Sequence, residues 1–370
     1  MPQTDQDLFY KIALSLIPGI GSVLARNLLA RLGRVEQVFS ESFKSLKKIP
    51  GIGEINARRI KDESVYIQAE KELKFIKKYN IQVSFFTDKS YPRRLRSCID
   101  APVILYCRGN MDLNWPKVLC IVGTRNATTY GKEISGQLIK NISGRGHKII
   151  IISGLAYGID IHVHKMSLKY GIPTVGILGH GLDRLYPSLH SDTAKKMLKS
   201  GGLVTEFPSR TKIDPSNFIR RNRIIAGLSD ATVVVESAEK GGALVTADIA
   251  SSYNRDVFTF PGRVTDTYSR GCNKLIRYNE ANLIQGIEDL EYFMGWESTD
   301  NTEYLQTEMF VDLIPEEIKI IELLKKSDRL FIDQISSELG MPGSKVSALL
   351  LELECKNIIS ALPGKLYSVK

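Results

Sequence analysis

Three arginines and an aromatic residue lie close together in the segment SNFIRRNRIIAGLSDA. Arg220, Arg221 and Arg223 surround Asn222, and Phe218 precedes Arg220 by two residues. Arginine offers phosphate oxygens a planar fork of donors, and an aromatic ring can stack on an unpaired base. This composition favours binding of a single-stranded nucleic acid. The same residues also fit the solvated start of a helix whose Phe218 packs into the core.

Small residues also gather at turns that lead into helices. VLCIVGTRNATT and IISGLAYGID pass from apolar runs into such turns, and GGALVTADIA is a glycine-rich start of a helix. Glycine lets a backbone approach a ligand, and a helix N-terminus presents N–H groups to anions. Three such turns on one sheet predict an anion site, with ordinary turns as the alternative. The residues concerned are Gly123, Thr124, Arg125, Ser153, Gly154, Gly241 and Gly242.

The segment around Arg125 lacks the two best-known phosphate-binding signatures. The P-loop spacing is absent because Lys132 is followed by Glu133, and the dinucleotide pattern G-x-G-x-x-G is also missing. We expect a helix to open at Thr128 or Thr129. The dipole of that helix would then act together with the Arg125 guanidinium on a phosphate.

Two other groups of polar residues suggest different chemistry. Asp160, His162 and His164 are residue types that bind metals, but histidines two positions apart at the start of a helix face different ways. We therefore expect no metal and no cofactor. Glu206 and Glu236 end apolar segments, where catalytic carboxylates could lie, so an enzyme stays an alternative. We find no Ser-His-Asp or Cys-His pattern.

The elements that position these residues alternate between strands and helices. Short apolar runs between 81 and 295 lack polar alternation, which indicates strands buried on both faces. Helical stretches between them predict an α/β fold with a doubly wound, mostly parallel, Rossmann-like sheet, whose ligands lie beyond the carboxyl ends of the strands. The predicted strands are IQVSFF, VLCIVG, KIIIISG, TVGILG, LVTEF, ATVVVES and DVFTFPG.

The motif IPGIG occurs twice near the start of the chain, at 17–21 and 49–53, each time before a helical stretch. A turn of this kind resembles the helix-hairpin-helix element, which holds DNA through its backbone. The arginines that follow the turns favour phosphate, whereas a plain junction between packed helices or a protein contact is the alternative. These arginines are Arg26, Arg31, Arg58 and Arg59.

The last part of the chain reads as three helices and a two-stranded wing, which predicts a winged-helix domain over 313–370. The predicted helices are PEEIKIIELLKKS, LFIDQISSELG and GSKVSALLLELECKN, and the predicted wing is IISALPGKLYSV. Such domains often read DNA through the third helix. Here that helix carries Glu352 and Glu354, whose charge repels phosphate, so we favour a protein-contact or regulatory role over DNA binding. The polar segment 295–309 is expected to be a linker. The predicted division is a helical domain over 1–70, the Rossmann-like core over 81–295 and the winged helix.

The composition agrees with a polyanion as partner. The net charge of the 370 residues is +9, and it divides into +5 for residues 1–90, +7 for 91–300 and −3 for 301–370. Five scattered cysteines without a C-x-x-C pair fit reduced thiols. With neither a signal peptide nor an apolar run of about 18 residues, we expect a cytoplasmic protein that does not enter a membrane.

An ordered series of motifs between 91 and 284 closely resembles the DNA-processing protein A family, DprA or Smf. The resemblance implies an extended Rossmann core that binds single-stranded DNA and loads the RecA recombinase during natural transformation. It also implies a homodimer through the Rossmann domain and no catalysis. The motifs are YPRRL, IVGTR, SGLAYGIDIHVH, GLDRLYP, TEFP, FIRRNRIIAGLSD, VVVES, GGALVTADIA and FPGRVTDTYSRGCNKLI.

The resemblance assigns roles residue by residue. Arg125 would be the main phosphate-binding arginine and Phe218 would stack a base. Arg220, Arg221, Asn222 and Arg223 would line the path of the bound DNA strand. The loops at Gly123, Ser153–Gly154 and Gly241–Gly242 would line the same pocket. Two positions depart from the family pattern, Val163 where alanine is usual and Gly241 where serine is usual.

A nucleotide-processing enzyme is the alternative that this resemblance leaves open. A related Rossmann family hydrolyses nucleoside monophosphates and carries P-G-G-x-G-T-x-x-E at its signature turn. This chain has EKGGALVTAD there, with Asp248 in place of the glutamate. We therefore do not expect hydrolysis.

Overall fold

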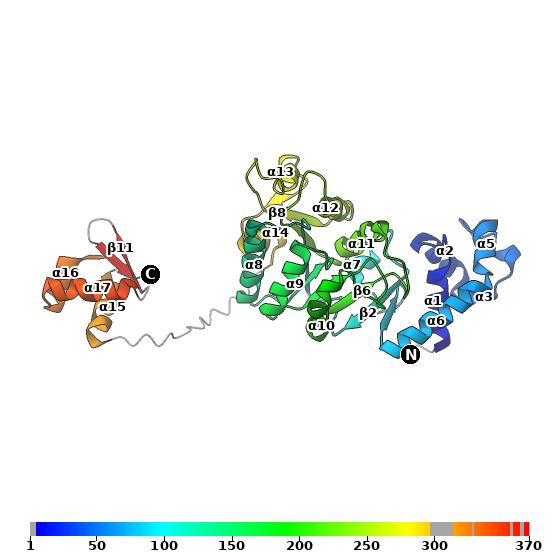
Figure 1. Cartoon of the computed structure of the whole chain (residues 1–370), viewed down its shortest axis with the longest axis horizontal. Coiled ribbons are helices and arrows are strands. Elements are labelled where there is room, and N and C mark those ends of the chain that lie inside the picture. Colours follow the sequence, from blue (N-terminus) through cyan, green and yellow to red (C-terminus); the bar gives the residue numbers. More distant parts are fainter. Residues whose placement is uncertain (1–4, 297–313, 328, 356–357, 363–365, 370) are drawn as a thin grey trace. The chain divides into compact units, whose positions relative to one another are not determined.

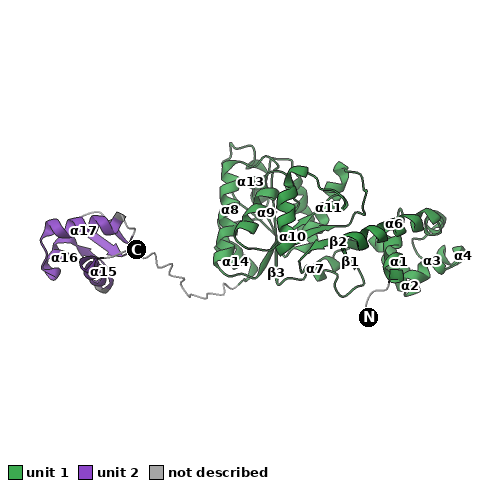
Figure 2. Ribbon diagram, turned by 60° about the horizontal axis from the view of Figure 1, so that its bottom comes forward, with its two compact units in different colours: residues 1–299 green, residues 300–370 purple. Residues whose placement is uncertain are grey.

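We analysed a computed structural model of the chain. It divides into two compact units, residues 1–299 and 300–370 (Figure 2). The residues that the structure describes are 5–296, 314–327, 329–355, 358–362 and 366–369.

The first unit is built on a nine-stranded sheet in the order β1-β2-β6-β5-β4-β3-β7-β8-β9. The seven strands β3 to β9 are parallel to one another, whereas β1 and β2 form an antiparallel edge beside β6. The mostly parallel sheet is thus confirmed. Its strands are β1 (Gln82–Phe85), β2 (Ile104–Gly109), β3 (Lys117–Val122), β4 (Ile149–Ser153), β5 (Thr174–Ile177), β6 (Gly202–Thr205), β7 (Ala231–Val234), β8 (Asp256–Thr259) and β9 (Asn282–Leu283).

All seven predicted segments form strands, but the prediction omits β2 and β9. Strand β9 has only two residues, too few for any pattern to show. Strand β2 is as apolar as its neighbours, and its first four residues are buried, so its signal was present in the sequence. Together β1 and β2 extend the parallel sheet toward the N-terminal helices.

The central strands serve two hydrophobic cores at once. Val118, Cys120 and Val122 of β3 belong to one core, and Leu119 and Ile121 belong to the core on the opposite face. Because successive side chains of a strand alternate between faces, an all-apolar strand needs helices on both sides. This explains why the strands show no polar alternation.

Helices pack against both faces of the sheet (Figure 1). One face carries α8, α9, α10 and α14, and the other carries α7, α11, α12 and α13, which makes the sheet doubly wound. Their bounds are α7 (Arg93–Arg96), α8 (Thr129–Gly144), α9 (Ile159–Lys169), α10 (Ser191–Ser200), α11 (Pro215–Leu228), α12 (Gly242–Ser252), α13 (Arg270–Arg277) and α14 (Ile287–Met294), with a 3-10 turn η1 (Ser188–His190) before α10.

The N-terminal helices form tandem hairpins around the two IPGIG turns. Gly19 and Gly51 adopt positive φ angles of 81° and 82°, which favour glycine, and Gly21 and Gly53 cap the helices that follow. The hairpins share a hydrophobic core with β1 and β2 of the sheet. The helices are α1 (Asp5–Leu16), α2 (Ser22–Leu32), α3 (Val35–Ser40), α4 (Phe43–Leu46), α5 (Glu54–Ile60) and α6 (Glu63–Tyr79).

The second unit has the winged-helix arrangement that the sequence predicts, with one correction. Leu330 and Phe331, expected at the start of the second helix, instead pair with β12 as a short strand. Two residues before a helix leave no strand pattern to detect. The elements are α15 (Pro315–Ser327), β10 (Leu330–Phe331), α16 (Ile332–Leu339), α17 (Gly343–Cys355), β11 (Ile359–Leu362) and β12 (Leu366–Val369).

The first two residues of the expected linker over 295–309 are ordered parts of the sheet domain. Gly295 caps α14, and the Trp296 side chain is only 8% exposed, with the Lys117 ammonium 5.4 Å from its ring centroid. These two residues therefore belong to the first unit. Residues 297–309 lie outside the described part of the chain.

Candidate nucleic-acid interface

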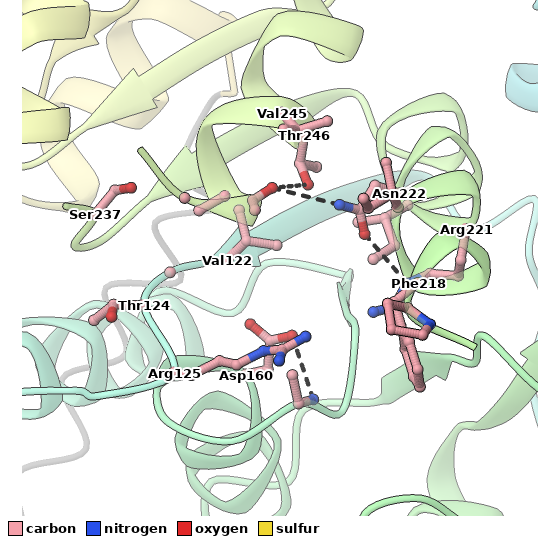
Figure 3. A pocket seen from close by; sticks show the side chains of 18 of the residues that line it. Val122, Thr124, Arg125, Asp160, Phe218, Arg221, Asn222, Ser237, Val245 and Thr246 are labelled. Carbon is pink, nitrogen blue, oxygen red and sulfur yellow. Dashed lines mark hydrogen bonds between the residues drawn. The ribbon is translucent and has the colours of Figure 1, made fainter. Parts of the chain in front are cut away.

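A pocket of about 620 Å³ opens where the strand order reverses between β3 and β7. In a doubly wound sheet this switch point is the usual ligand site. Its walls are the loops after β3 and β7, the start of α12 and one side of α11 (Figure 3). The pocket gathers these predicted residues: Gly123, Thr124, Arg125, Phe218, Arg221, Asn222, Gly241 and Gly242.

The loop after β3 is fixed by backbone hydrogen bonds on both sides. The Thr124 N–H donates to the Glu236 carbonyl at 2.8 Å, and the Thr124 carbonyl accepts from the Ile159 N–H at 3.1 Å. Gly123 is needed here because a Cβ atom would lie 2.5 Å from Cγ1 of Ile159. The loop therefore presents the next residue, Arg125, from a fixed position.

Arg125 is exposed and extends from this loop toward α11 (Figure 3). Within the residues that the structure describes, no hydrogen bond or ion pair engages its guanidinium. Burial lowers the pKa of Arg221 on the facing wall, and the positive charge of Arg125 adds to that shift. The Arg125 donors are thus free for a ligand, and a neighbouring positive charge would be relieved by an anion.

Glu236 has a capping role at the start of α8. The carboxylate is buried and accepts from the Thr128 N–H at 3.0 Å and from the Thr128 hydroxyl at 2.5 Å. The helix begins at Thr129 with Thr128 as its cap, as predicted. Gly131 leaves room for this carboxylate, because a Cβ there would lie 2.1 Å from Oε2. Glu236 is therefore not among the residues that line the pocket.

Arg221 is buried and bonds to the protein backbone, whereas the sequence predicts that it contacts the DNA strand. It is 4% exposed and donates to the Gly154 carbonyl at 2.7 Å and to the Ile177 carbonyl. Burial lowers the pKa of Arg221 to about 10, and the Asp160 charge acts against this shift. Asp160 in turn accepts from the Gly154 N–H at 3.1 Å. The cationic side chain thereby joins α11 to the ends of β4 and β5.

Four predicted residues lie outside the pocket lining, and one of them is Gly154, which bonds to Arg221 and Asp160. Ser153 is fully buried and donates to the Ile121 carbonyl at 2.7 Å. Arg223 and Arg220 both pair with the Glu206 carboxylate, at 2.5 and 2.9 Å. Arg220 stays exposed on the surface of α11, whereas Arg223 is mostly covered. These side chains already have partners in the protein, which the sequence pattern alone does not reveal.

Phe218 is half-buried on the pocket wall. One side of its ring lies against Gly179, where a Cβ would come within 2.8 Å of the ring, and Tyr186 lies 5.7 Å away between ring centroids. Tyr186 is 46% exposed and also lines the pocket. Phe218 is therefore not a residue of the buried core, and the two rings form an aromatic wall.

The start of α12 forms the opposite wall. Gly241 caps this helix without a side-chain hydrogen bond, and a Cβ at Gly242 would meet no atom within 4 Å. Asn222 reaches across from α11, with its amide donating to the Gly242 carbonyl at 3.4 Å. The helix N-terminus is thus open to the pocket and favours an anion.

Sequence reasoning missed Tyr186 and Lys240. Both line the pocket, and Lys240 is exposed directly before the glycines of α12. The signal for Lys240 was present, because a lysine in EKGG stands next to a glycine-rich start of a helix. Tyr186 gave no such signal, since it follows a loop far from Phe218 in the sequence.

One histidine of the group that could suggest metal binding, His164, lies in the protein interior. His164 is fully buried beside Thr174, with 2.7 Å between Nδ1 and the hydroxyl, and burial lowers its pKa to about 3. It therefore stays neutral at physiological pH. Among the described residues, no group of three or more His, Cys, Asp or Glu side chains could hold a metal ion. No helix in the described part of the chain is long and apolar enough to cross a membrane.

Most arginines of the tandem hairpins already have partners. Arg26 donates to backbone carbonyls at Arg96 and Cys98, Arg59 donates to the Pro18 carbonyl, and Arg58 pairs with a neighbouring glutamate. These contacts hold the hairpins together and attach them to the segment before β2. They give no direct support for phosphate binding by the turns.

The fold and the pocket define a class of protein: a Rossmann-like domain with an arginine- and lysine-lined pocket at its switch point, preceded in the sequence by a helix-hairpin-helix tandem and followed by a winged helix. Comparison with known families agrees. Residues 82–295 match DNA recombination-mediator protein A, residues 12–64 match the SAM-like helix-hairpin-helix tandem, and residues 311–365 match the DprA winged helix domain. The chain belongs to the DprA/Smf family of DNA recombination-mediator proteins.

Individual relatives support this membership. The DNA processing protein DprA of Bacillus subtilis is 35% identical over 274 residues, which cover 73% of this chain and 91% of that protein. Protein Smf of Synechocystis is 31% identical and covers 97% of this chain and 98% of its own length. The X-ray structure of DprA from Streptococcus pneumoniae superposes with a TM-score of 0.62 at 27% identity, over 79% of this chain and 98% of that one.

A second solved relative bears on the ligand. The structure of DNA processing protein A from Helicobacter pylori, which concerns its single-stranded DNA binding mode, superposes with a TM-score of 0.52 at 26% identity. The match covers 58% of this chain and 97% of that one.

Proposed function

We propose that this protein binds single-stranded DNA in the pocket between β3, β7 and α11. The observation that carries the proposal is the combination of free Arg125 donors, an open α12 N-terminus and the aromatic wall of Phe218 and Tyr186. Cations that follow a backbone and rings that stack bases are what single-strand binding requires. The single-stranded DNA binding of the Helicobacter pylori relative supports the same choice of ligand.

The proposed roles separate contact residues from positioning residues. Arg125, Lys240 and the backbone at Gly241–Gly242 bind phosphate, and Phe218 with Tyr186 stacks a base. Gly123 and Thr124 hold the Arg125 loop. Exposed Arg220 makes a peripheral contact with the DNA strand. The other predicted residues position the pocket walls, and they are Ser153, Gly154, Arg221, Asn222 and Arg223.

The wider role rests on the family. We propose that the protein protects incoming strands and loads RecA during natural transformation, acts in the cytoplasm, and forms a homodimer through the Rossmann domain. The division into 1–70, 81–295 and 313–370 is part of this proposal. Exposed Glu352 and Glu354 on α17 favour a protein contact for the winged helix, since their charge would repel phosphate.

The hydrolase alternative finds little support in the geometry. Glu236 caps α8 and Glu206 pairs with two arginines, so neither carboxylate faces the phosphate-binding pocket. Asp248, at the position of the family glutamate, lines a separate pocket with Lys274. Incubation with AMP should therefore release no adenine.

A titration with oligonucleotides tests the proposed ligand. The full chain should bind single strands more tightly than duplexes of the same length, with little preference for sequence, because a duplex offers Phe218 no unstacked base. Fluorescence anisotropy at several salt concentrations measures both affinities. Equal affinity for the two forms would contradict single-strand recognition.

A further inference from the structure

A second basic pocket lies on the side of the N-terminal helices. It has a volume of about 510 Å³ and lies between the C-terminal half of α6, the exposed end of β2 and two loops of the sheet domain. Its lining contains five cationic side chains and one acidic side chain, Asp183. The cationic residues are Lys71, Lys74, Lys78, Arg108 and Arg210.

The charges of this pocket are available to a ligand. Asp183 is already paired with Arg184 at 2.9 Å, which removes the one opposing charge. Lys74 pairs with Glu70, but both side chains are at least 60% exposed, and exposed pairs are weak. No partner engages the Arg108 guanidinium in the part of the chain that the structure describes. The pocket therefore has a net positive charge.

Aromatic rings accompany these cations. Phe75 and Tyr79 lie 4.8 Å apart between ring centroids, and Tyr79 is 43% exposed. The Lys78 ammonium lies 5.4 Å from the Tyr79 ring. Interleaved cations and rings on one surface are the composition that binds single-stranded nucleic acid.

Two chain segments border both pockets. One contributes Asp183 to the second pocket and Tyr186 to the first, and the other contributes Arg210 to the second and Ile213 to the first. Along each segment, only two residues separate a residue that lines one pocket from a residue that lines the other.

Glu72 fixes α6 to this surface. Its buried carboxylate accepts from the Ser209 N–H at 3.0 Å and from the Ser209 hydroxyl at 2.5 Å. Burial raises the pKa of Glu72, and the hydrogen bonds from Ser209 act against that shift. The lysines of α6 are thus held beside the loop that leads to Phe218.

We propose that this second pocket binds the backbone of the same single strand after it leaves the first pocket, so that the binding track continues onto α6. This inference rests on the proposed function and extends its footprint. A protein or a free phosphate as the occupant would give no dependence on strand length. The length of the bound strand is therefore the property to measure.

The experiment compares affinities across oligothymidylates from about 4 to about 30 nucleotides, a range that spans known single-strand site sizes. The test variant is Lys78→Ala with Arg108→Ala. The control is Lys140→Ala with Lys169→Ala, exposed lysines near the C-terminal ends of α8 and α9 that line neither pocket. Lys169 lies 5.4 Å from the Tyr170 ring and so matches Lys78 over Tyr79.

We expect the affinity of the wild type and of the control to rise with strand length. In the test variant, the ratio of long-strand to short-strand affinity should be roughly tenfold smaller than in the wild type. Its salt slope on long strands should also be flatter by up to about 1.4, for two phosphates at about 0.7 each. On the shortest strands all three proteins should have the same affinity.

Equal gains in affinity with length in the test variant and the wild type would overturn the second contact while leaving the first pocket intact. Equal losses of affinity in the test and control variants would do the same. No binding by the wild type at any length would overturn the proposed function itself, and the extended track with it.

Discussion

Arg125 and Arg221 lie on facing walls of one pocket, yet their surroundings differ in every respect. Arg221 is buried, its donors engage two backbone carbonyls, and Asp160 lies beside it. Arg125 is exposed on a loop whose backbone is fixed while its guanidinium has no partner among the described residues. The first arginine shapes the pocket, and the second is left to bind a ligand.

Lining the proposed phosphate pocket therefore does not by itself make an arginine a phosphate ligand. A buried guanidinium with satisfied donors gains nothing from a new anion, because it would have to give up existing hydrogen bonds. An exposed guanidinium on a rigid loop has no such bonds to lose. Variants at the two positions should therefore fail in different ways.

The largest effect should come from Arg221→Ala. The change leaves the Gly154 and Ile177 carbonyls without this donor and removes the positive charge that acts on buried Asp160. At about 1–3 kcal/mol for each unsatisfied buried group, the free energy of unfolding should fall by about 3–5 kcal/mol. Chemical denaturation measures this loss. Arg125→Ala is the control and should stay within about 0.5 kcal/mol of the wild type.

A double variant sharpens that result. If the charge left on Asp160 causes the loss, Arg221→Met combined with Asp160→Asn should be less destabilised than the sum of the two single changes. Strict additivity, or an Arg221→Ala protein as stable as the wild type, would mean that Arg221 does not hold the pocket together.

The next effect should come from Phe218→Ala. Loss of stacking should weaken single-strand binding by about 1–3 kcal/mol and leave the salt slope unchanged, because no charge is removed. Tyr186→Ala should act in the same direction if the two rings form one wall. A melting curve separates lost stacking from lost packing, and a stable Phe218→Ala protein with full affinity would exclude the stacking role.

The smallest effect should come from deleting residues 313–370. The third helix of the winged domain presents acidic side chains, so its loss should change single-strand affinity by less than tenfold, about 1.4 kcal/mol. The same anisotropy titration checks this. A greater loss would show that the winged helix contacts DNA, contrary to its charge.

Much of the fold could be predicted from the sequence because it follows from local patterns. Apolar β-branched runs such as KIIIISG need covering on both faces, and that requirement alone predicts a doubly wound sheet. Strands β9 and β10 could not be predicted, because two residues carry no periodicity.

The candidate site could be predicted only in part, because burial and pairing depend on distant residues. Arg220, Arg221 and Arg223 look equivalent in the sequence, yet Arg221 meets a carbonyl 67 positions away and the other two share Glu206. Ser153 likewise turns inward to the neighbouring strand. A sequence motif identifies residue types near a ligand, whereas the tertiary structure decides which of them remain free.

The role of Arg125 as the free phosphate ligand is tested most directly by the salt dependence of single-strand binding in Arg125→Ala. A charge-assisted phosphate contact is worth about 1.5–3 kcal/mol, so the affinity should fall roughly ten- to a hundredfold. The slope of log affinity against log salt should flatten by up to about 0.7, the release expected for one single-strand phosphate. Both changes are expected in a protein with unchanged stability. A wild-type salt slope in Arg125→Ala would contradict this role, because the free arginine would then hold no phosphate.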